Sequence, residues 1–82
     1  MPPKKKRPAV AAHRTPSRQI FAANLKRLRT KMGQTQLGLS ECSGYTVSYV
    51  SMLECGTRNP TLDTLDVLAR CLSTTAADLI KE

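Results

Sequence analysis

The feature that most limits the fold is a close series of helix stop and start signals after residue 32. Three glycines stand where the helical periodicity breaks off, and glycine suits that place because it accepts a positive φ. Threonines that can cap a new helix follow these breaks, and another stands near the C-terminus. The residues are Gly33, Thr35, Gly44, Thr46, Gly56, Thr61 and Thr75. Since no stretch alternates with the period of two typical of strands, the sequence predicts an all-α domain of five short helices.

Apolar residues at helical spacing indicate the extent of each helix. We expect helices over 17–32, from the Thr35 cap to about residue 42, from the Thr46 cap to residue 55, and after the Thr61 and Thr75 caps. The inward residues expected are Ile20, Phe21, Leu25, Leu28 and Met32 in the first helix, and Leu62, Leu65, Leu68, Ala69 and Leu72 in the fourth.

Charge is distributed unevenly along the chain. Residues 1–31 carry ten bases and no acid, whereas residues 32–82 carry three bases and all six acids. This asymmetry favours a polyanionic partner. Nucleic acid is favoured over an anionic membrane because no helix joins the bases to an exposed apolar face. Bases that are merely solvated are the alternative.

Residues 1–16 are expected to form a disordered basic arm, and residues 17–82 the folded domain. The arm contains four of the five prolines and five bases, with Val10 as its one large apolar residue. Such a segment cannot bury enough surface to offset the entropy of ordering it. Its basic cluster suits a nonspecific grip on phosphates, contact with specific bases, or a nuclear-import signal. The cluster comprises Lys4, Lys5, Lys6 and Arg7.

The three cysteines are odd in number and include no C-x-x-C pair, and His13 is the one histidine. This pattern favours neither a disulfide framework nor a zinc site. We expect Cys42, Cys55 and Cys71 to be reduced thiols in or near the core. A redox switch or an intermolecular disulfide is the alternative.

Enzymes and membrane proteins are disfavoured. His13 lies in the arm and the acids are scattered, so no acid–base pair or nucleophile triad can be assembled, and no metal or cofactor is expected. No run approaches the roughly 20 apolar residues of a membrane span, and the N-terminus lacks the pattern of a signal peptide. The chain is therefore expected to be cytoplasmic, near the nucleoid.

Residues 36–55 are the segment expected to carry function. Two short helices joined by a tight glycine turn must cross steeply, which is helix-turn-helix geometry. It requires inward-facing apolar residues, a small residue where the helices touch and a positive φ in the turn. These requirements are met by Leu39, Ser40, Gly44, Tyr45, Val50 and Leu53. Ser43 before the glycine and Gly38 inside the first of the two helices depart from the usual pattern.

This region resembles the helix-turn-helix regulators of the Cro and lambda repressor type, over about residues 20–80. The most specific match is the run Leu53-Glu54-x-Gly56-x-Arg58-Asn59-Pro60, and further matches are Gly33-x-Thr35-Gln36-x-x-Leu39 and Gly44-x-Thr46. The resemblance implies a five-helix, lambda-repressor-like domain. It also implies a regulator of transcription that binds double-stranded operator DNA as a symmetric homodimer.

The resemblance further implies where DNA binds. Gln36 would contact a phosphate at the start of its helix, where free N–H groups attract an anion. Arg58 and Asn59 match a loop that contacts phosphate, with turn formation as the alternative. The recognition helix would lie in the major groove. Its exposed residues would be Thr46, Val47, Ser48, Tyr49, Ser51 and Met52.

The expected recognition helix has few side chains suited to direct recognition of bases. Val47, Ser48 and Met52 offer no bidentate partner for guanine or adenine. Specificity would then depend on thymine methyls, on single or water-mediated hydrogen bonds, on the deformability of the duplex, or on the arm.

Two further roles follow from the resemblance. Arg29 and Glu54 match an ion pair that orients the first and third helices. The family pairs through its C-terminal segment, and here that segment holds the candidates left for a dimer interface after the core is filled, with closure of the monomer core as the alternative. This set comprises Leu72, Thr74, Thr75, Leu79 and Ile80.

The sequence is therefore interpreted as a DNA-binding transcriptional regulator of the repressor or controller type. The alternative is a protein-binding module, such as an antitoxin or coactivator, that has only nonspecific affinity for DNA.

Overall fold

The computed structural model describes residues 16–82, which are all-helical in their regular structure. The helices are α1 (Pro16–Lys31), α2 (Gln36–Ser43), α3 (Val47–Glu54), α4 (Leu62–Cys71) and α5 (Ala76–Ile80). The described residues thus confirm the predicted five short helices, although Pro16, assigned to the arm from the sequence, is the first residue of α1. No helix of this part of the chain is long and apolar enough to cross a membrane.

The predicted threonine caps are present at four helix starts. Each hydroxyl accepts a hydrogen bond from the backbone N–H three residues later, which satisfies a donor that the helix itself leaves free. The caps are Thr35 on α2, Thr46 on α3, Thr61 on α4 and Thr75 on α5. Local sequence therefore determines where each of these helices begins.

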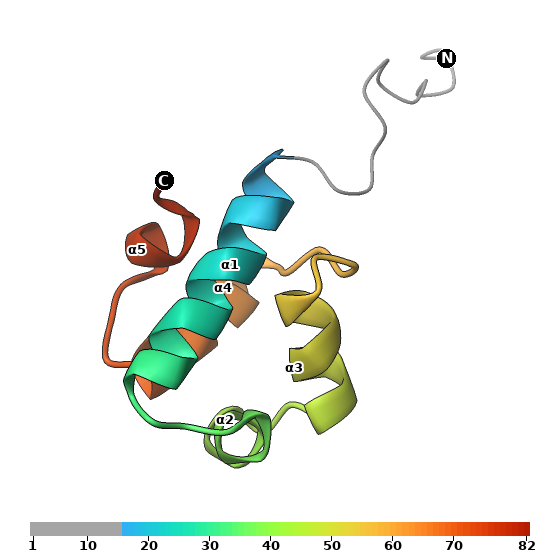
Figure 1. The fold of residues 1–82 in the computed structure, drawn as a ribbon, viewed down its shortest axis with the longest axis vertical. Helices are drawn as coiled ribbons and strands as arrows, with labels where there is room; N and C mark the ends of the chain where they lie inside the picture. The colour runs from blue at the N-terminus through green and yellow to red at the C-terminus, as the bar shows by residue number, and fades with distance from the viewer. Residues whose placement is uncertain (1–15) are drawn as a thin grey trace.

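The core lies between the five helices, with α3 and α5 on opposite sides of α1 (Figure 1). Its buried apolar residues are Phe21, Leu25, Leu39, Val50, Leu53, Leu65, Leu68, Ala69, Leu72 and Leu79. Two predicted core residues are wrong: Leu62 is 79% exposed and Met32 is 45% exposed. In the first turn of α4 it is Thr64 that faces inward, because the docking of the helix sets its rotation.

A buried asparagine fastens the C-terminal segment to α1. The Asn24 side-chain amide donates to the carbonyl oxygens of Leu79 at 3.1 Å and Lys81 at 2.7 Å. These carbonyls lie at the end of α5, where no helical partner remains for them. Nearby, the Thr74 hydroxyl donates to Asp78 Oδ2 at 2.7 Å and lowers the pKa of that carboxyl.

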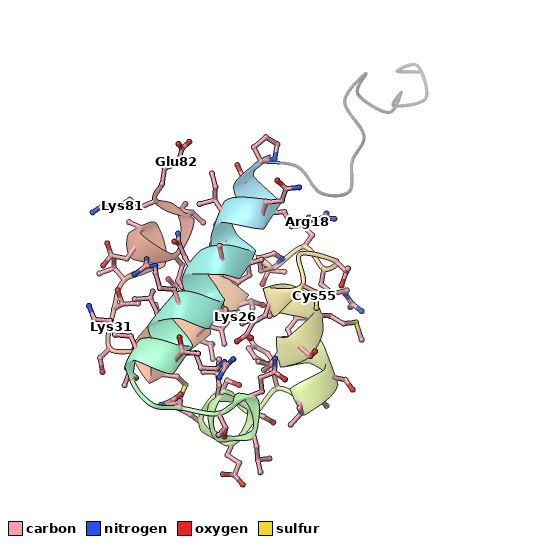
Figure 2. The ribbon with its side chains drawn as sticks, in the orientation of Figure 1. Arg18, Lys26, Lys31, Cys55, Lys81 and Glu82 are labelled. Carbon is pink, nitrogen blue, oxygen red and sulfur yellow. A yellow bond between two sulfur atoms is a disulfide. The ribbon has the colours of Figure 1, made fainter. Side chains whose placement is uncertain are left out.

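The cysteine prediction is wrong in two respects. Cys42 on α2 and Cys71 at the end of α4 form a disulfide, with their Cα atoms 6.0 Å apart. Cys55 is a free thiol, but it is exposed at the end of α3 rather than near the core (Figure 2). The pairing could not be inferred from the spacing, because 29 residues separate the two cysteines and only the docking of α2 against α4 brings them together.

Candidate nucleic-acid interface

The α2–turn–α3 unit is packed against the core and braced across its turn by hydrogen bonds. Gly44 ends α2 with φ of 82°, a conformation that a residue with a Cβ rarely adopts, and its N–H donates to the Ser40 carbonyl. The Ser40 hydroxyl donates to the Tyr45 carbonyl at 2.5 Å across the turn. Leu39 and Val50 are fully buried beneath the two helices. The helix-turn-helix geometry expected from the sequence is therefore present.

The outer face of α3 is neutral. Val47 is 39% exposed and Met52 is 38% exposed, and Thr46 and Ser48 are also exposed. Tyr49 and Ser51 are half-buried at its edges. This face therefore presents hydroxyl and apolar groups but no charged or amide side chain of its own.

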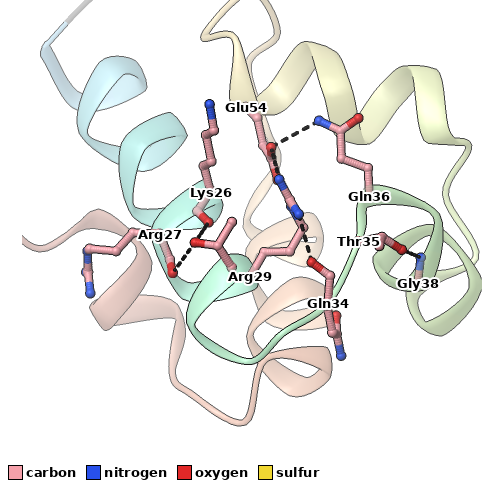
Figure 3. A network of polar contacts seen from close by, with 9 residues as sticks. Lys26, Arg27, Arg29, Gln34, Thr35, Gln36, Gly38 and Glu54 are labelled. Carbon is pink, nitrogen blue, oxygen red and sulfur yellow. Dashed lines mark hydrogen bonds and ion pairs between the residues drawn. The ribbon is translucent and has the colours of Figure 1, made fainter.

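An ion-pair network lies behind this face and joins α1, α2 and α3 (Figure 3). Arg29 donates to both oxygens of Glu54, from Nε at 2.5 Å and from Nη2 at 3.0 Å, and from Nη1 to the Gln34 carbonyl at 2.8 Å. Only 11% of the Arg29 side chain and 3% of the Glu54 side chain are exposed. The predicted Arg29–Glu54 ion pair is therefore present and largely buried.

The network also fixes the charge of Arg29. Its hydrogen bond to Glu54 raises the pKa of the guanidinium, against the opposing effect of burial. Because the folded state raises this pKa above an already high ordinary value, the stabilisation is present throughout the neutral range. On the side of Arg29, it would be lost as the pH rises through the raised pKa, far above the neutral range.

Gln36 is half-buried at the start of α2, and its side chain is turned inward. Its Nε2 donates to Glu54 Oε1 at 3.0 Å (Figure 3). An amide nitrogen carries two hydrogens, so this bond orients the side chain and leaves one donor. Sequence reasoning assigned Gln36 to a phosphate but missed its link to Glu54.

Arg58 and Asn59 are both exposed in the loop after α3. The Arg58 guanidinium lies 5.5 Å from the centre of the Tyr49 ring. Its Nη1 is 3.8 Å from Met52 Sδ. The loop therefore places a positive charge against the neutral outer face of α3, a contact that the sequence did not indicate.

The remaining predicted residues are distributed as follows. Lys4, Lys5, Lys6 and Arg7 lie outside the described residues. In the C-terminal set, Leu72 and Leu79 are buried in the core of the single chain, so their side chains are not available at its surface. Thr74 is half-buried, while Thr75 and Ile80 are exposed. Within residues 16–82, no cluster of three His, Cys, Asp or Glu side chains could hold a metal ion.

The sequence matches the family model described as helix-turn-helix over residues 25–79. The chain belongs to the helix-turn-helix family. Its type is that of Cro and the lambda repressor, as the residues of the turn and the loop indicated, and the family consists of DNA-binding regulators of transcription.

Relatives of this helix-turn-helix protein cover most of its folded part. The HTH-type transcriptional regulator y4dJ of Sinorhizobium fredii is 40% identical over 63 residues, which are 77% of this chain and 82% of that protein. Control protein C.SmaI of Serratia marcescens is 35% identical over 77% of this chain and 75% of that protein. The solved structure of the restriction-modification controller protein C.AhdI from Aeromonas hydrophila is similar, with a TM-score of 0.73 at 35% identity, over 76% of this chain and 94% of that chain.

Proposed function

We propose that this helix-turn-helix protein is a sequence-specific regulator of transcription that binds an inverted-repeat operator as a homodimer. The observation that carries the proposal is the outer face of α3, which is exposed while the rest of the helix is fixed to the core and to the Arg29–Glu54 pair. The likeness to a control protein and to a restriction-modification controller protein supports the repressor or controller type.

In this proposal α3 lies in the major groove, with Val47, Ser48 and Met52 toward the bases. The free N–H groups at the start of α2 and the remaining donor of Gln36 face a phosphate. A homodimer would place the two half-sites about 10 base pairs apart, one turn of the duplex. Ile80 and Thr75 are the exposed members of the predicted dimer set and would lie at the pairing surface. The protein would act in the cytoplasm, on the nucleoid.

The test is selection of bound duplexes from a random DNA library, followed by affinity measurements. We expect an enriched palindrome that is bound more tightly than a scrambled duplex by a factor above about 10³ at one fixed salt concentration. Ser48→Ala should weaken binding to the palindrome without changing the circular dichroism spectrum. If no sequence is enriched and both duplexes bind weakly, the proposed function is wrong.

A second candidate function is suggested by the neutral outer face of α3. A helix that offers hydroxyl and apolar groups also suits contact with another protein, as in an antitoxin or a coactivator. Equal affinity for unrelated duplexes, together with a protein partner that is released by Met52→Lys, would favour this candidate.

The basic arm is proposed to add phosphate contacts. Deleting residues 2–14 removes Lys4, Lys5, Lys6, Arg7 and Arg14. Each lost phosphate contact should lower the slope of log affinity against log salt by about 0.9, so the full deletion should lower it by several units. Binding is measured by fluorescence anisotropy at four salt concentrations. An unchanged slope would mean that the arm does not touch DNA.

A further inference from the structure

The outer face of α3 lacks a group that can distinguish a base by two hydrogen bonds, yet a guanidinium rests against it. Arg58 is contributed by the following loop and lies against Tyr49 and Met52, which are three residues apart on α3 and so share one side of the helix. Among residues 16–82, Arg58 is the arginine that contacts the side chains of this face. Neither turn formation nor a general positive charge would require Arg58 to lie in this place.

Two contacts limit where the Arg58 guanidinium can go. A cation within about 6 Å of an aromatic ring centre is attracted to the ring face, and Arg58 lies at 5.5 Å from that of Tyr49. The Met52 sulfur is a weak acceptor at 3.8 Å from Nη1. These contacts hold the charge beside α3 and leave other guanidinium N–H donors free.

Tyr49 is in turn supported from the core. Its ring meets the ring of Tyr45 edge to face, with centres 5.2 Å apart and planes inclined at 64°. The Tyr45 hydroxyl donates to the hydroxyl oxygen of Thr64 on α4 at 3.4 Å, and Thr64 is buried. A chain of contacts therefore runs from α4 through two aromatic rings to Arg58, so the guanidinium is positioned by packed side chains.

We infer that Arg58 is a specificity-determining residue that donates two hydrogen bonds to a guanine at the edge of each half-site. Arginine paired with the O6 and N7 atoms of guanine is the commonest specific contact in the major groove, and this chain's α3 supplies no such donor itself. The contacts with Tyr49 and Met52 hold the charge beside the face that would meet the bases, whereas a phosphate contact would need only a charge at the rim. The inference rests on the proposed function, because it requires α3 to lie in the major groove.

The test compares selected sequences and affinities for the wild-type chain and three variants. Arg58→Ala removes the donors, Arg58→Lys keeps the charge but replaces the rigid planar guanidinium with a flexible ammonium, and Arg70→Ala is a matched control that removes an exposed arginine from α4. We expect one guanine per half-site to be required by the wild-type chain and by Arg70→Ala. Replacing that guanine with 7-deazaguanine or adenine should weaken wild-type binding about 10- to 100-fold. Arg58→Ala should bind the altered and unaltered operators equally, and Arg58→Lys should discriminate between them less than the wild-type chain does.

Two variants of Tyr49 test whether its ring positions Arg58. Tyr49→Phe keeps the ring and should keep the guanine preference, whereas Tyr49→Leu removes the ring and should reduce it. The thermal midpoint of each variant is measured alongside.

The outcomes separate this inference from the proposed function. If Arg58→Ala binds every operator more weakly by the same factor, and its slope of log affinity against log salt falls by about one, Arg58 touches a phosphate and the inference is wrong. The proposed function as a regulator of transcription would still hold in that case. If the wild-type chain enriches no sequence at all, the proposed function fails and the inference fails with it.

Discussion

Replacing Glu54 with alanine is expected to lower the free energy of unfolding by about 3–5 kcal/mol, the usual effect of removing one partner from a buried ion pair. The Arg29 guanidinium would then be left buried with the Gln34 carbonyl as its remaining acceptor, and Gln36 would lose the acceptor for its amide. The total free energy of unfolding of a domain of this size is only about 3–10 kcal/mol. The loss is therefore a large fraction of the total stability, and urea denaturation followed by circular dichroism should show a much lower midpoint for the variant.

Two controls distinguish the effect of breaking the Arg29–Glu54 pair from the effect of removing any carboxylate. Glu41 is exposed on α2 and has no ion-pair partner among the described residues, so Glu41→Ala should change stability by less than about 0.5 kcal/mol. The double variant Arg29→Met with Glu54→Leu removes both charges and should be much closer to the wild type than Glu54→Ala. A loss below about 1 kcal/mol for Glu54→Ala would contradict the role assigned to the network.

Reducing the Cys42–Cys71 disulfide is expected to lower the free energy of unfolding by about 3–4 kcal/mol. The bond closes a loop across 29 residues, and opening it restores conformational freedom chiefly to the unfolded chain. Cys42 is exposed on the surface of α2, so a small reductant can reach the bond without unfolding the protein. Denaturation with and without dithiothreitol gives the difference directly.

Variants at the cysteines provide the comparison. Cys42→Ser should be about as stable as the reduced wild-type chain and should not respond to reductant. Cys55→Ser removes an exposed free thiol and should keep the full response. Titration of the denatured protein should find one thiol per chain before reduction and three afterwards. Three thiols before reduction, with no effect of dithiothreitol on stability, would show that the bond is not formed in solution.

Features that depend on residues close together in the sequence were predicted correctly, whereas contacts between distant residues were mostly not. The α3 boundaries followed from Thr46 and Gly56, because a cap and a positive φ depend on neighbouring residues alone. The inward side of α4 was nearly correct from periodicity, but Leu62 was misplaced because the pattern does not fix how a helix is rotated about its axis. The Arg29–Glu54 pair was predicted only through the family resemblance, since 25 residues separate the two.

The sequence by itself determined the starts of α2 to α5, the glycine turn between α2 and α3, and most of the buried apolar set, since each depends on local conformation or on the removal of apolar side chains from water. The tertiary structure alone decided which distant polar groups meet. It joined Cys42 to Cys71, placed Asn24 against the end of α5 and laid Arg58 over Tyr49. Those contacts depend on distances of a few ångströms between separate elements, and such distances are fixed only when the helices dock on one shared core.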